Sequence, residues 1–400
     1  MQFGIEVLLA DSNLKKQLKG RRLSLVAHPA SVDSKLQHSM DLLAADPELK
    51  LTSAFGPQHG MRGEKQYNMV ETQDYLDPRY QIPVFSLYGK VRRPTPEMMD
   101  SFDLVLFDLQ DVGTRIYTFL TTLRYMLEEC ARFNKTIWVL DRPNPAGRPI
   151  EGHCLQPGWE SFVGAGPLPM RHGLTLGECA IWLKNHLSLN VDLKVVSMAG
   201  YDPHRGPGFG WPSESHSWVN PSPNAPSLNM ARCYPGTVMI EGTNLSEGRG
   251  TTKALEVCGA PDLDFQKILK WMHKTAPTWL EGGSLRHCYF QPTFYKFNAQ
   301  LCQGFQFHTD NQSYQHHRFQ PYRTVALAFK AIRNLYPEFQ LWRDFHYEYE
   351  TTKLAIDVIS GGPFLRQWVD DNQAKCQDFD AVVIPDEKKW AQETAAIHIY

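Results

Sequence analysis

Short apolar runs alternate with amphipathic stretches along the first half of the chain. The apolar runs have the length of buried strands, whereas the stretches between them, such as residues 117–133, follow the period of a helix. This alternation is typical of βαβ units, and it predicts an α/β fold with a Rossmann-like, doubly wound and mostly parallel sheet. The predicted strands are Leu23–His28, Leu49–Phe55, Val84–Leu87, Leu104–Leu109, Thr136–Leu140 and Leu193–Met198.

One helix start is marked more clearly than the others. Thr175 is followed three residues later by Glu178 and then by the apolar run 179–183, which is the pattern of a capping box. Residues 200–227 then change character, because Pro, Gly, Ser and Trp dominate there. We expect an ordered irregular loop over these residues, and we place the boundary between two domains at its start.

The second half of the chain mixes helical and strand patterns and predicts an α+β domain. Helix-like segments lie at 264–274 and 322–335, and aromatic, alternating strands lie around 285–307. A chain of 400 residues also exceeds the size at which a single hydrophobic core usually stops growing. We therefore predict a Rossmann-like domain over residues 1–200 and an α+β domain over residues 201–400.

Charge and composition exclude several classes of partner. The 41 basic and 43 acidic residues give a net charge of −2 without a long run of one sign, which argues against nucleic acid. The first residues lack the basic and apolar regions of a signal peptide, and nowhere do about 18 apolar residues run together. We therefore expect a cytoplasmic protein with no membrane partner. The eight cysteines are scattered without a CxxC pair, which favours reduced thiols over a zinc site.

Polar loops follow four of the predicted strands. Because ligands of open parallel sheets bind beyond the carboxyl ends of the strands, we expect a ligand site at this rim. For any single Asp or Arg, a helix cap or a loop salt bridge is an equal alternative. No loop has the spacing of a GxGxxG or P-loop motif and nothing requires a metal, so we expect no cofactor. The four loops are Gly56–Gly63, Tyr88–Pro94, Gln110–Thr118 and Asp141–Pro149.

A second polar cluster lies in EGTNLSEGRGTTKALEVCGAP, residues Glu241–Pro261. Glu241, Glu247 and Arg249 lie there among glycines, which let the backbone approach a ligand closely. The glycines rule out a regular helix, so both carboxylates facing one cavity and a loop salt bridge between Glu247 and Arg249 stay open as alternatives.

These loops together resemble one bacterial family. The motifs GPQHGMRG, PVFSLYGKVRRPT, FDLQDVGTRIYTF, VLDRPNP, GPLPMRHGLTLGE, SPNAPS, YPGTVMIEGTNLSEGRGTT and GAP occur in this order over most of the chain. They resemble the NamZ-type exo-β-N-acetylmuramidases, first catalogued as domain of unknown function 1343 and now glycoside hydrolase family 171. The resemblance implies a Rossmann-like N-terminal domain, a C-terminal domain of unusual fold and an active cleft between them. It also implies removal of terminal β-linked N-acetylmuramic acid during peptidoglycan recycling.

The resemblance also implies a set of site residues. Glycosidases generally use two carboxyl groups, and the matched motifs supply Asp111, Glu241 and Glu247, with His59 as a further catalytic candidate. Muramic acid differs from glucosamine by a lactyl ether with a carboxylate, which the planar fork of Arg suits. The substrate-binding candidates are Gln58, Arg62, Arg115, Tyr117, Arg171, Asn224, Asn244 and Arg249.

One position departs from the family pattern. Many relatives have Glu in a PEHG motif where this chain has Gln58, and glutamine can serve neither as proton donor nor as nucleophile. We favour a working enzyme with a modified site. The alternatives are a protein that binds muramyl sugars without cleaving them, and a hydrolase or transferase that acts on another anionic small molecule.

Overall fold

The structure has two lobes. The first lobe contains the strands of the first half of the chain, which form a seven-stranded sheet in the order β3-β4-β2-β1-β5-β6-β7, and only the edge strand β3 runs antiparallel. The structure is a computed structural model that describes residues 1–63, 65, 67 and 69–400. Without β3, the strand order is that of the Rossmann fold, and the six predicted strands are confirmed. The strands are β1 Arg22–Val26, β2 Lys50–Gly56, β3 Tyr75–Leu76, β4 Pro83–Ser86, β5 Leu104–Phe107, β6 Thr136–Leu140 and β7 Asp192–Val196.

Helices cover both faces of this sheet, because successive side chains of each strand point to opposite faces. Leu104 and Leu106 of β5 pack in one core with α1, α2 and α3, whereas Val105 and Phe107 pack in the other with α4, α5 and α6. The predicted capping box at Thr175 is confirmed at the start of α6. The helices are α1 Gly4–Ala10, α2 Ser12–Leu18, α3 Ser39–Ala45, α4 Pro96–Asp100, α5 Phe119–Arg132 and α6 Leu176–His186.

The second lobe contains a three-stranded antiparallel sheet, in the order β8-β10-β9, packed against helices. This arrangement confirms the predicted α+β class, and the two predicted helices correspond to α8 and α9. None of the helices in the described part of the chain is long and apolar enough to cross a membrane. The elements are α7 Leu228–Thr237, η1 Val238–Gly242, β8 Val257–Ala260, α8 Phe265–Thr275, η2 Pro277–Leu280, β9 Ser284–Phe290, β10 Cys302–His308, α9 Pro321–Leu335, α10 Ala355–Ser360, α11 Phe364–Asp370, α12 Cys376–Thr394 and η3 Ala395–Ile397.

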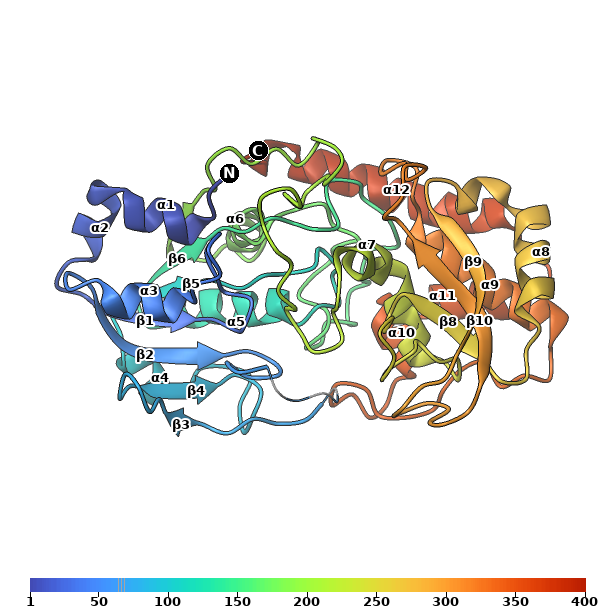
Figure 1. The fold of residues 1–400 in the computed structure, drawn as a ribbon, viewed down its shortest axis with the longest axis horizontal. Helices are drawn as coiled ribbons and strands as arrows, with labels where there is room; N and C mark the ends of the chain where they lie inside the picture. Colours follow the sequence, from blue (N-terminus) through green and yellow to red (C-terminus); the bar gives the residue numbers. More distant parts are fainter. Residues whose placement is uncertain (64, 66, 68) are drawn as a thin grey trace.

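The two lobes lie side by side and share one hydrophobic core (Figure 1). Residues 200–227 form the expected irregular loop, which passes in front of the junction. Helix α12 begins in the second lobe and runs back over the first, where the Trp390 indole donates to the His172 carbonyl at 2.8 Å. The domain boundary at residue 200 stays a prediction.

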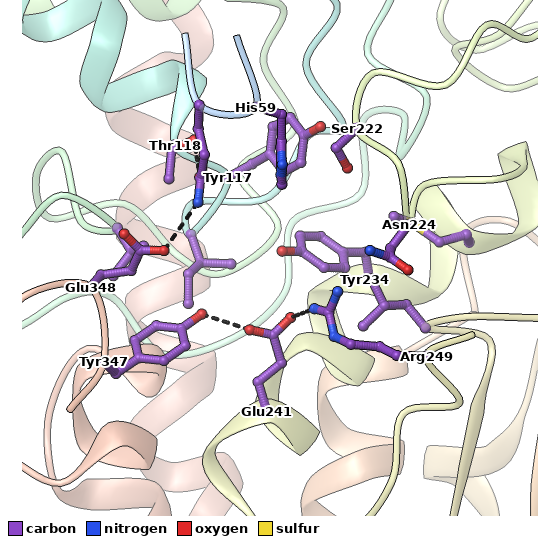
Figure 2. Close-up of a pocket in the computed structure, with 15 residues that line it drawn as sticks. His59, Tyr117, Thr118, Ser222, Asn224, Tyr234, Glu241, Arg249, Tyr347 and Glu348 are labelled. Carbon is purple, nitrogen blue, oxygen red and sulfur yellow. Dashed lines mark hydrogen bonds and ion pairs between the residues drawn. The ribbon is translucent and has the colours of Figure 1, made fainter. Parts of the chain in front are cut away.

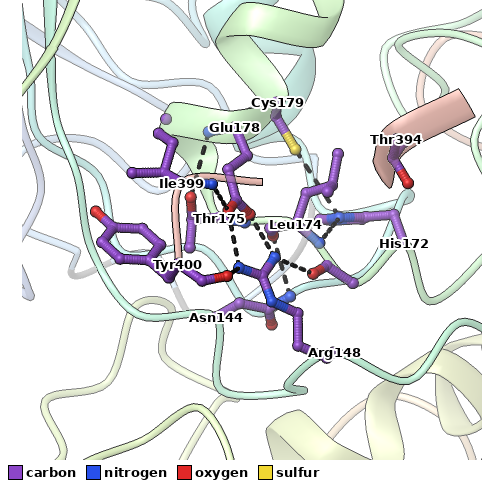
Figure 3. Close-up of polar contacts among 12 residues, drawn as sticks. Asn144, Arg148, His172, Leu174, Thr175, Glu178, Cys179, Thr394, Ile399 and Tyr400 are labelled. Atoms are coloured by element: carbon purple, nitrogen blue, oxygen red, sulfur yellow. Dashed lines mark hydrogen bonds and ion pairs between the residues drawn. The ribbon is translucent and has the colours of Figure 1, made fainter. Parts of the chain in front are cut away.

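Residues 399 and 400 are tied into the first lobe around a buried ion pair (Figure 3). Arg148 donates to both carboxylate oxygens of Glu178, at 2.6 and 2.8 Å. The backbone N–H of Ile399 donates to Glu178 at 2.8 Å, and Arg148 also donates to the Tyr400 carbonyl at 2.9 Å. These contacts hold the end of the second half against α6, and with α12 they fix the position of one lobe relative to the other.

All eight cysteines carry free thiols, and most of them are buried. Burial raises the pKa of the Cys302 thiol to about 11, and it raises the pKa of the Cys130 thiol further. These thiols are therefore protonated at neutral pH and behave as small apolar side chains in the core.

Candidate active site

A cavity lies at the carboxyl ends of the parallel strands, where the two lobes meet (Figure 2). The first lobe contributes the loops after β2 and β5, and the second contributes α7, η1 and two later loops. A Rossmann-like sheet binds its ligands at this edge, near the point where the strand order reverses between β1 and β5. The lining residues are Gln58, His59, Ile116, Tyr117, Thr118, Val163, Ser222, Asn224, Met230, Tyr234, Glu241, Arg249, Leu255, Tyr347 and Glu348.

Glu241 lies on the cavity wall with both carboxylate oxygens held by donors. Arg249 Nη2 donates to Oε1 at 2.6 Å, and the Tyr347 hydroxyl donates to Oε2 at 2.9 Å. Glu241 is only 3% exposed, and the adjacent guanidinium compensates the cost of burying its negative charge. Glu241 is therefore a fixed, charged carboxylate facing the cavity.

Glu247 lies behind Arg249 and outside the cavity lining. Its Oε1 accepts from Arg249 Nε at 2.8 Å, and its Oε2 lies 2.8 Å from Lys296 Nζ. Burial favours the protonated form, but Lys296 and Arg249 outweigh it and lower the pKa of Glu247 below its usual value. The buried salt bridge between Glu247 and Arg249, left open by the sequence, is present in the structure, and it leaves Arg249 Nη1 without a partner among the described residues.

Glu348 is a second carboxyl group on the cavity wall, and it differs from Glu241 in its partners. The Tyr88 hydroxyl donates to Oε2 at 2.8 Å and Gln58 Nε2 donates to Oε1 at 3.2 Å, so both donors are neutral. Burial, with a smaller contribution from Glu241, raises the pKa of Glu348 to about 7. A substantial fraction of Glu348 is therefore protonated at neutral pH.

His59 presents a neutral imidazole to the cavity. Burial lowers the pKa of His59 to about 4, and Nδ1 lies 2.8 Å from the Lys65 carbonyl, to which it donates. Nε2 therefore carries the lone pair and can accept a hydrogen bond. His59 also has a positive φ of 69°, a conformation that non-glycine residues rarely adopt and that is concentrated at functional sites.

Known proteins of one family resemble this chain along almost its whole length. Models of exo-β-N-acetylmuramidase NamZ match it, the N-terminal model over residues 23–229 and the C-terminal model over residues 232–400. The chain is 39% identical over 375 residues to the peptidoglycan β-N-acetylmuramidase NamZ of Bacillus subtilis (strain 168), a match that covers 93% of this chain and 84% of that protein. The chain belongs to the NamZ exo-β-N-acetylmuramidase family.

Two solved structures of DUF1343 family proteins from Bacteroides fragilis NCTC 9343 have the same fold as this NamZ-family chain. The first is 28% identical with a TM-score of 0.85, and the second is 23% identical with a TM-score of 0.75. Each match covers 100% of this chain and 98% of the other. The family and fold expected from the ordered motifs are thus confirmed.

The cavity brings together half of the residues that the NamZ motifs predicted for the site. Figure 2 shows several of them pointing inward from both lobes. The predicted residues that line the cavity are Gln58, His59, Tyr117, Asn224, Glu241 and Arg249. Those that do not line it are Arg62, Asp111, Arg115, Arg171, Asn244 and Glu247.

Arg115 and Arg171 are buried in the protein and support irregular backbone. Arg115 donates to the carbonyls of His153, Leu168 and Ile359 at 2.9 to 3.1 Å. Arg171 donates to two further carbonyls, those of Ala146 and Phe319. Because these guanidinium groups donate to backbone carbonyls inside the fold and do not line the cavity, we do not propose either arginine as a ligand of the lactyl carboxylate.

The other three predicted residues also lie apart from the cavity lining. The Arg62 guanidinium lies over the Tyr75 ring at 4.6 Å, and Asn244 donates to the Gln340 carbonyl at 2.7 Å. Asp111 accepts from the Gly113 N–H at 2.6 Å, and burial raises the pKa of Asp111 to about 7. Each of these side chains is engaged with its own loop or a neighbouring one.

Sequence reasoning did not select Tyr88, Tyr347 or Glu348. Tyr88 lies inside a matched motif, so its loop was identified without the residue itself. Glu348 lies in the part of the chain after residue 262, which has few recognisable motifs, and no sequence signal marks it. Within the described ranges, no three His, Cys, Asp or Glu side chains are grouped as a metal site would require.

Proposed function

We propose that this NamZ-family chain hydrolyses the β-glycosidic bond of a terminal N-acetylmuramic acid in peptidoglycan fragments. The observation that supports it most is the buried cavity with the fixed carboxylate Glu241 and the incompletely bonded guanidinium of Arg249 on one wall.

Arg249 is the proposed ligand of the lactyl carboxylate. Of the four arginines that the sequence offered for this role, Arg62, Arg115 and Arg171 do not line the cavity, whereas Arg249 does. Arg249 is 5% exposed, and its Nη1 has no partner within the described residues. A buried guanidinium N–H without an acceptor is unfavourable, so a substrate carboxylate at this point gains a charge-assisted hydrogen bond.

Neutral polar groups from both lobes suit the remaining substituents of the sugar. His59 offers an acceptor nitrogen, and Asn224 offers an amide with both donor and acceptor atoms. The hydroxyls of Tyr117 and Ser222 face the same space (Figure 2). These groups match the hydroxyl and acetamido groups of N-acetylmuramic acid.

Glu241 is the proposed carboxylate partner of the reaction. Glycoside hydrolysis requires one carboxylate that acts as nucleophile or activates water, and a second group that protonates the leaving oxygen. Glu241 is held in its charged form by Arg249 and is oriented by Tyr347. It can therefore serve as the nucleophile or as the base.

The direct test is the release of 4-nitrophenol from 4-nitrophenyl N-acetyl-β-muramide by the wild-type protein. We expect turnover of the muramide, little turnover of the corresponding N-acetylglucosaminide, and a loss of about 10²–10⁴-fold in kcat/KM for Glu241→Gln. Asp262→Asn, which changes an exposed carboxylate directly after the segment Glu241–Pro261, is the matched control and should behave as wild type. Absence of turnover, or equal turnover of both glycosides, would contradict the proposal.

We also propose that the enzyme acts in the cytoplasm on imported wall fragments. Eight free thiols are consistent with a reducing compartment, because exported proteins tend to pair their cysteines. Fractionation of the source cells, with detection of the protein in each fraction, tests this location, and recovery outside the cytoplasm would contradict it.

A further inference from the structure

We propose that Glu348 is the proton donor of this site and takes over the acid role that Gln58 cannot perform. The inference rests on the proposed function, because it assigns the second group of the same hydrolytic reaction. Glu348 and Glu241 lie on neighbouring walls of one cavity, and Figure 2 shows both carboxyl groups directed into the space between the lobes.

The backbone around Glu348 forms a tight two-residue turn. Tyr347 and Glu350 pair through backbone hydrogen bonds at 3.0 and 3.3 Å, and the two residues between them have φ values of +47° and +69°. Such turns normally contain Asn and Gly, because side chains with a Cβ are strained in the left-handed region. Here the strained positions hold Glu348 and Tyr349, and backbone strain of this kind is concentrated where function requires a side chain in one place.

The turn places two consecutive side chains, those of Tyr347 and Glu348, on the cavity wall. Tyr347 orients Glu241 through its hydroxyl, and Glu348 meets Tyr88 and Gln58 from the first lobe. One short segment of the second lobe therefore fixes both carboxyl groups relative to each other and to the sheet edge. A third neighbour, Tyr349, points outward and is 52% exposed.

Among the described residues, no Lys or Arg side chain forms a salt bridge with Glu348. Glu241 faces it and favours its neutral form, while Tyr88 and Gln58 donate hydrogen bonds to it. Arg92 is only a minor electrostatic influence on the pKa of Glu348, and its guanidinium lies over the rings of Tyr88 and Tyr349, at 4.7 and 3.8 Å. Burial raises the pKa of Glu348 to about 7, so one carboxyl of the cavity is charged and the other is available as an acid.

Gln58 is fixed as a hydrogen-bond donor to Glu348. Thr118 Oγ1 donates to the Gln58 carbonyl oxygen at 2.8 Å, which directs the amide nitrogen to Glu348 Oε1. Gln58 is therefore a positioning residue in this chain. Each Glu348 oxygen accepts one hydrogen bond from the described residues, and either oxygen can carry the acidic proton on its other lone pair.

In the proposed step, the glycosidic C1–O bond breaks as the Glu348 proton passes to the leaving oxygen, which departs as an alcohol. C1 gains the hydroxyl of one water molecule. The other proton of that water returns to the carboxyl pair, so the site regains its starting protonation and one water is consumed per bond. Glu241 supplies the negative charge that faces the developing positive charge at C1.

Two substrates with different leaving groups separate an acid role from a structural one. A 4-nitrophenolate leaves without protonation, whereas the sugar alcohol of muramyl-β-1,4-N-acetylglucosamine requires a proton. We expect Glu348→Gln to lower kcat/KM by about 10²–10⁴-fold on the disaccharide but by no more than about tenfold on the 4-nitrophenyl muramide. Equal losses on both substrates would overturn the assignment. Asp344→Asn, which changes an exposed carboxylate four residues before Glu348 on the same loop, is the matched control and should leave both rates unchanged.

The wild-type enzyme provides a second test that needs no variant. If Glu348 donates the proton, kcat/KM on the disaccharide falls above a pH of about 7, while kcat/KM on the 4-nitrophenyl muramide lacks this limb. A limb of the same size on both substrates would refute the assignment. The proposed function fails when wild type cleaves neither muramide, or cleaves the muramide and the glucosaminide equally, whereas the acid assignment fails on the comparison of the two muramides, so the two failures are distinguishable.

Discussion

Replacing Glu247 with Gln should destabilise the fold far more than the same replacement of a catalytic carboxylate would. Glu247 is 1% exposed, and its two oxygens lie 2.8 Å from Arg249 Nε and 2.8 Å from Lys296 Nζ. The variant leaves these two buried cations to share one remaining carboxylate, Glu241. Removing one member of a buried ion pair costs about 3–5 kcal/mol, a large part of the total stability of a typical domain.

The shape of the side chain is unchanged in this variant, so the loss measures charge and not a cavity. We expect the free energy of unfolding, from urea denaturation followed by tryptophan fluorescence, to fall by about 3–5 kcal/mol. Activity on the muramide should fall as well, because Arg249 loses the carboxylate that orients it. Glu48→Gln, which removes an exposed partner of Lys19 at 3.1 Å, should cost at most about 1 kcal/mol.

The opposite pattern would refute this reasoning. Carboxylates that act on substrate are often kept at a cost to stability, so their removal leaves the fold as stable as before or more stable. If Glu247→Gln abolishes activity but changes the free energy of unfolding by less than about 1 kcal/mol, Glu247 is a reacting group and the cavity described above is incomplete. The depressed pKa of Glu247 has a further consequence, because its stabilisation is present at neutral pH and is lost as the pH falls through that value.

Three further changes test other parts of the structure. Arg249→Lys should reduce the preference for muramide over glucosaminide by about tenfold or more, measured as the ratio of the two kcat/KM values, because an ammonium cannot replace the guanidinium fork. Gln58→Glu places a second carboxyl beside Glu348, so the two groups share one proton. The pH above which kcat/KM on the disaccharide declines should therefore increase by about 1 pH unit; an unchanged pH profile would contradict this. Arg148→Met leaves Glu178 buried without its cation, and the free energy of unfolding should fall by about 3–5 kcal/mol; a loss below about 1 kcal/mol would show that the hydrogen bonds to Glu178 from the N–H groups of Thr175 and Ile399 suffice.

The architecture of the first lobe was readable from the sequence because its signals are local. Each buried strand is a short apolar run, and Thr175 and Glu178 mark a helix start through contacts within one turn. Strand β3 was missed, because Tyr75–Leu76 is only two residues long and is a strand only through its pairing with β4. Pairing across a sheet edge has no signature in so short a segment.

The site was only partly readable, because residue type does not reveal where a side chain points. Arg115 and Arg249 both lie in matched motifs with Gly nearby, yet one donates to backbone carbonyls inside the fold and the other faces the cavity. Glu348 could not be identified from the sequence for a related reason. Its role depends on a turn with two left-handed residues and on partners 260 and 290 positions away in the sequence.

The division of polar groups between the lobes explains why this site requires both halves of the chain. The first lobe supplies the uncharged groups Gln58, His59 and Tyr117, whereas the carboxyl groups of Glu241 and Glu348 and the guanidinium of Arg249 come from the second. The charges of Glu241 and Arg249 are balanced within the second lobe by Glu247 and Lys296, so they need no charged partner from the first lobe. The acidity of Glu348, however, depends on burial by the first lobe and on hydrogen bonds from Tyr88 and Gln58. Any motion that parts the lobes would hydrate Glu348, lower its pKa and remove the proton donor, so the contacts of α12 that hold the lobes together also sustain the chemistry of the cavity.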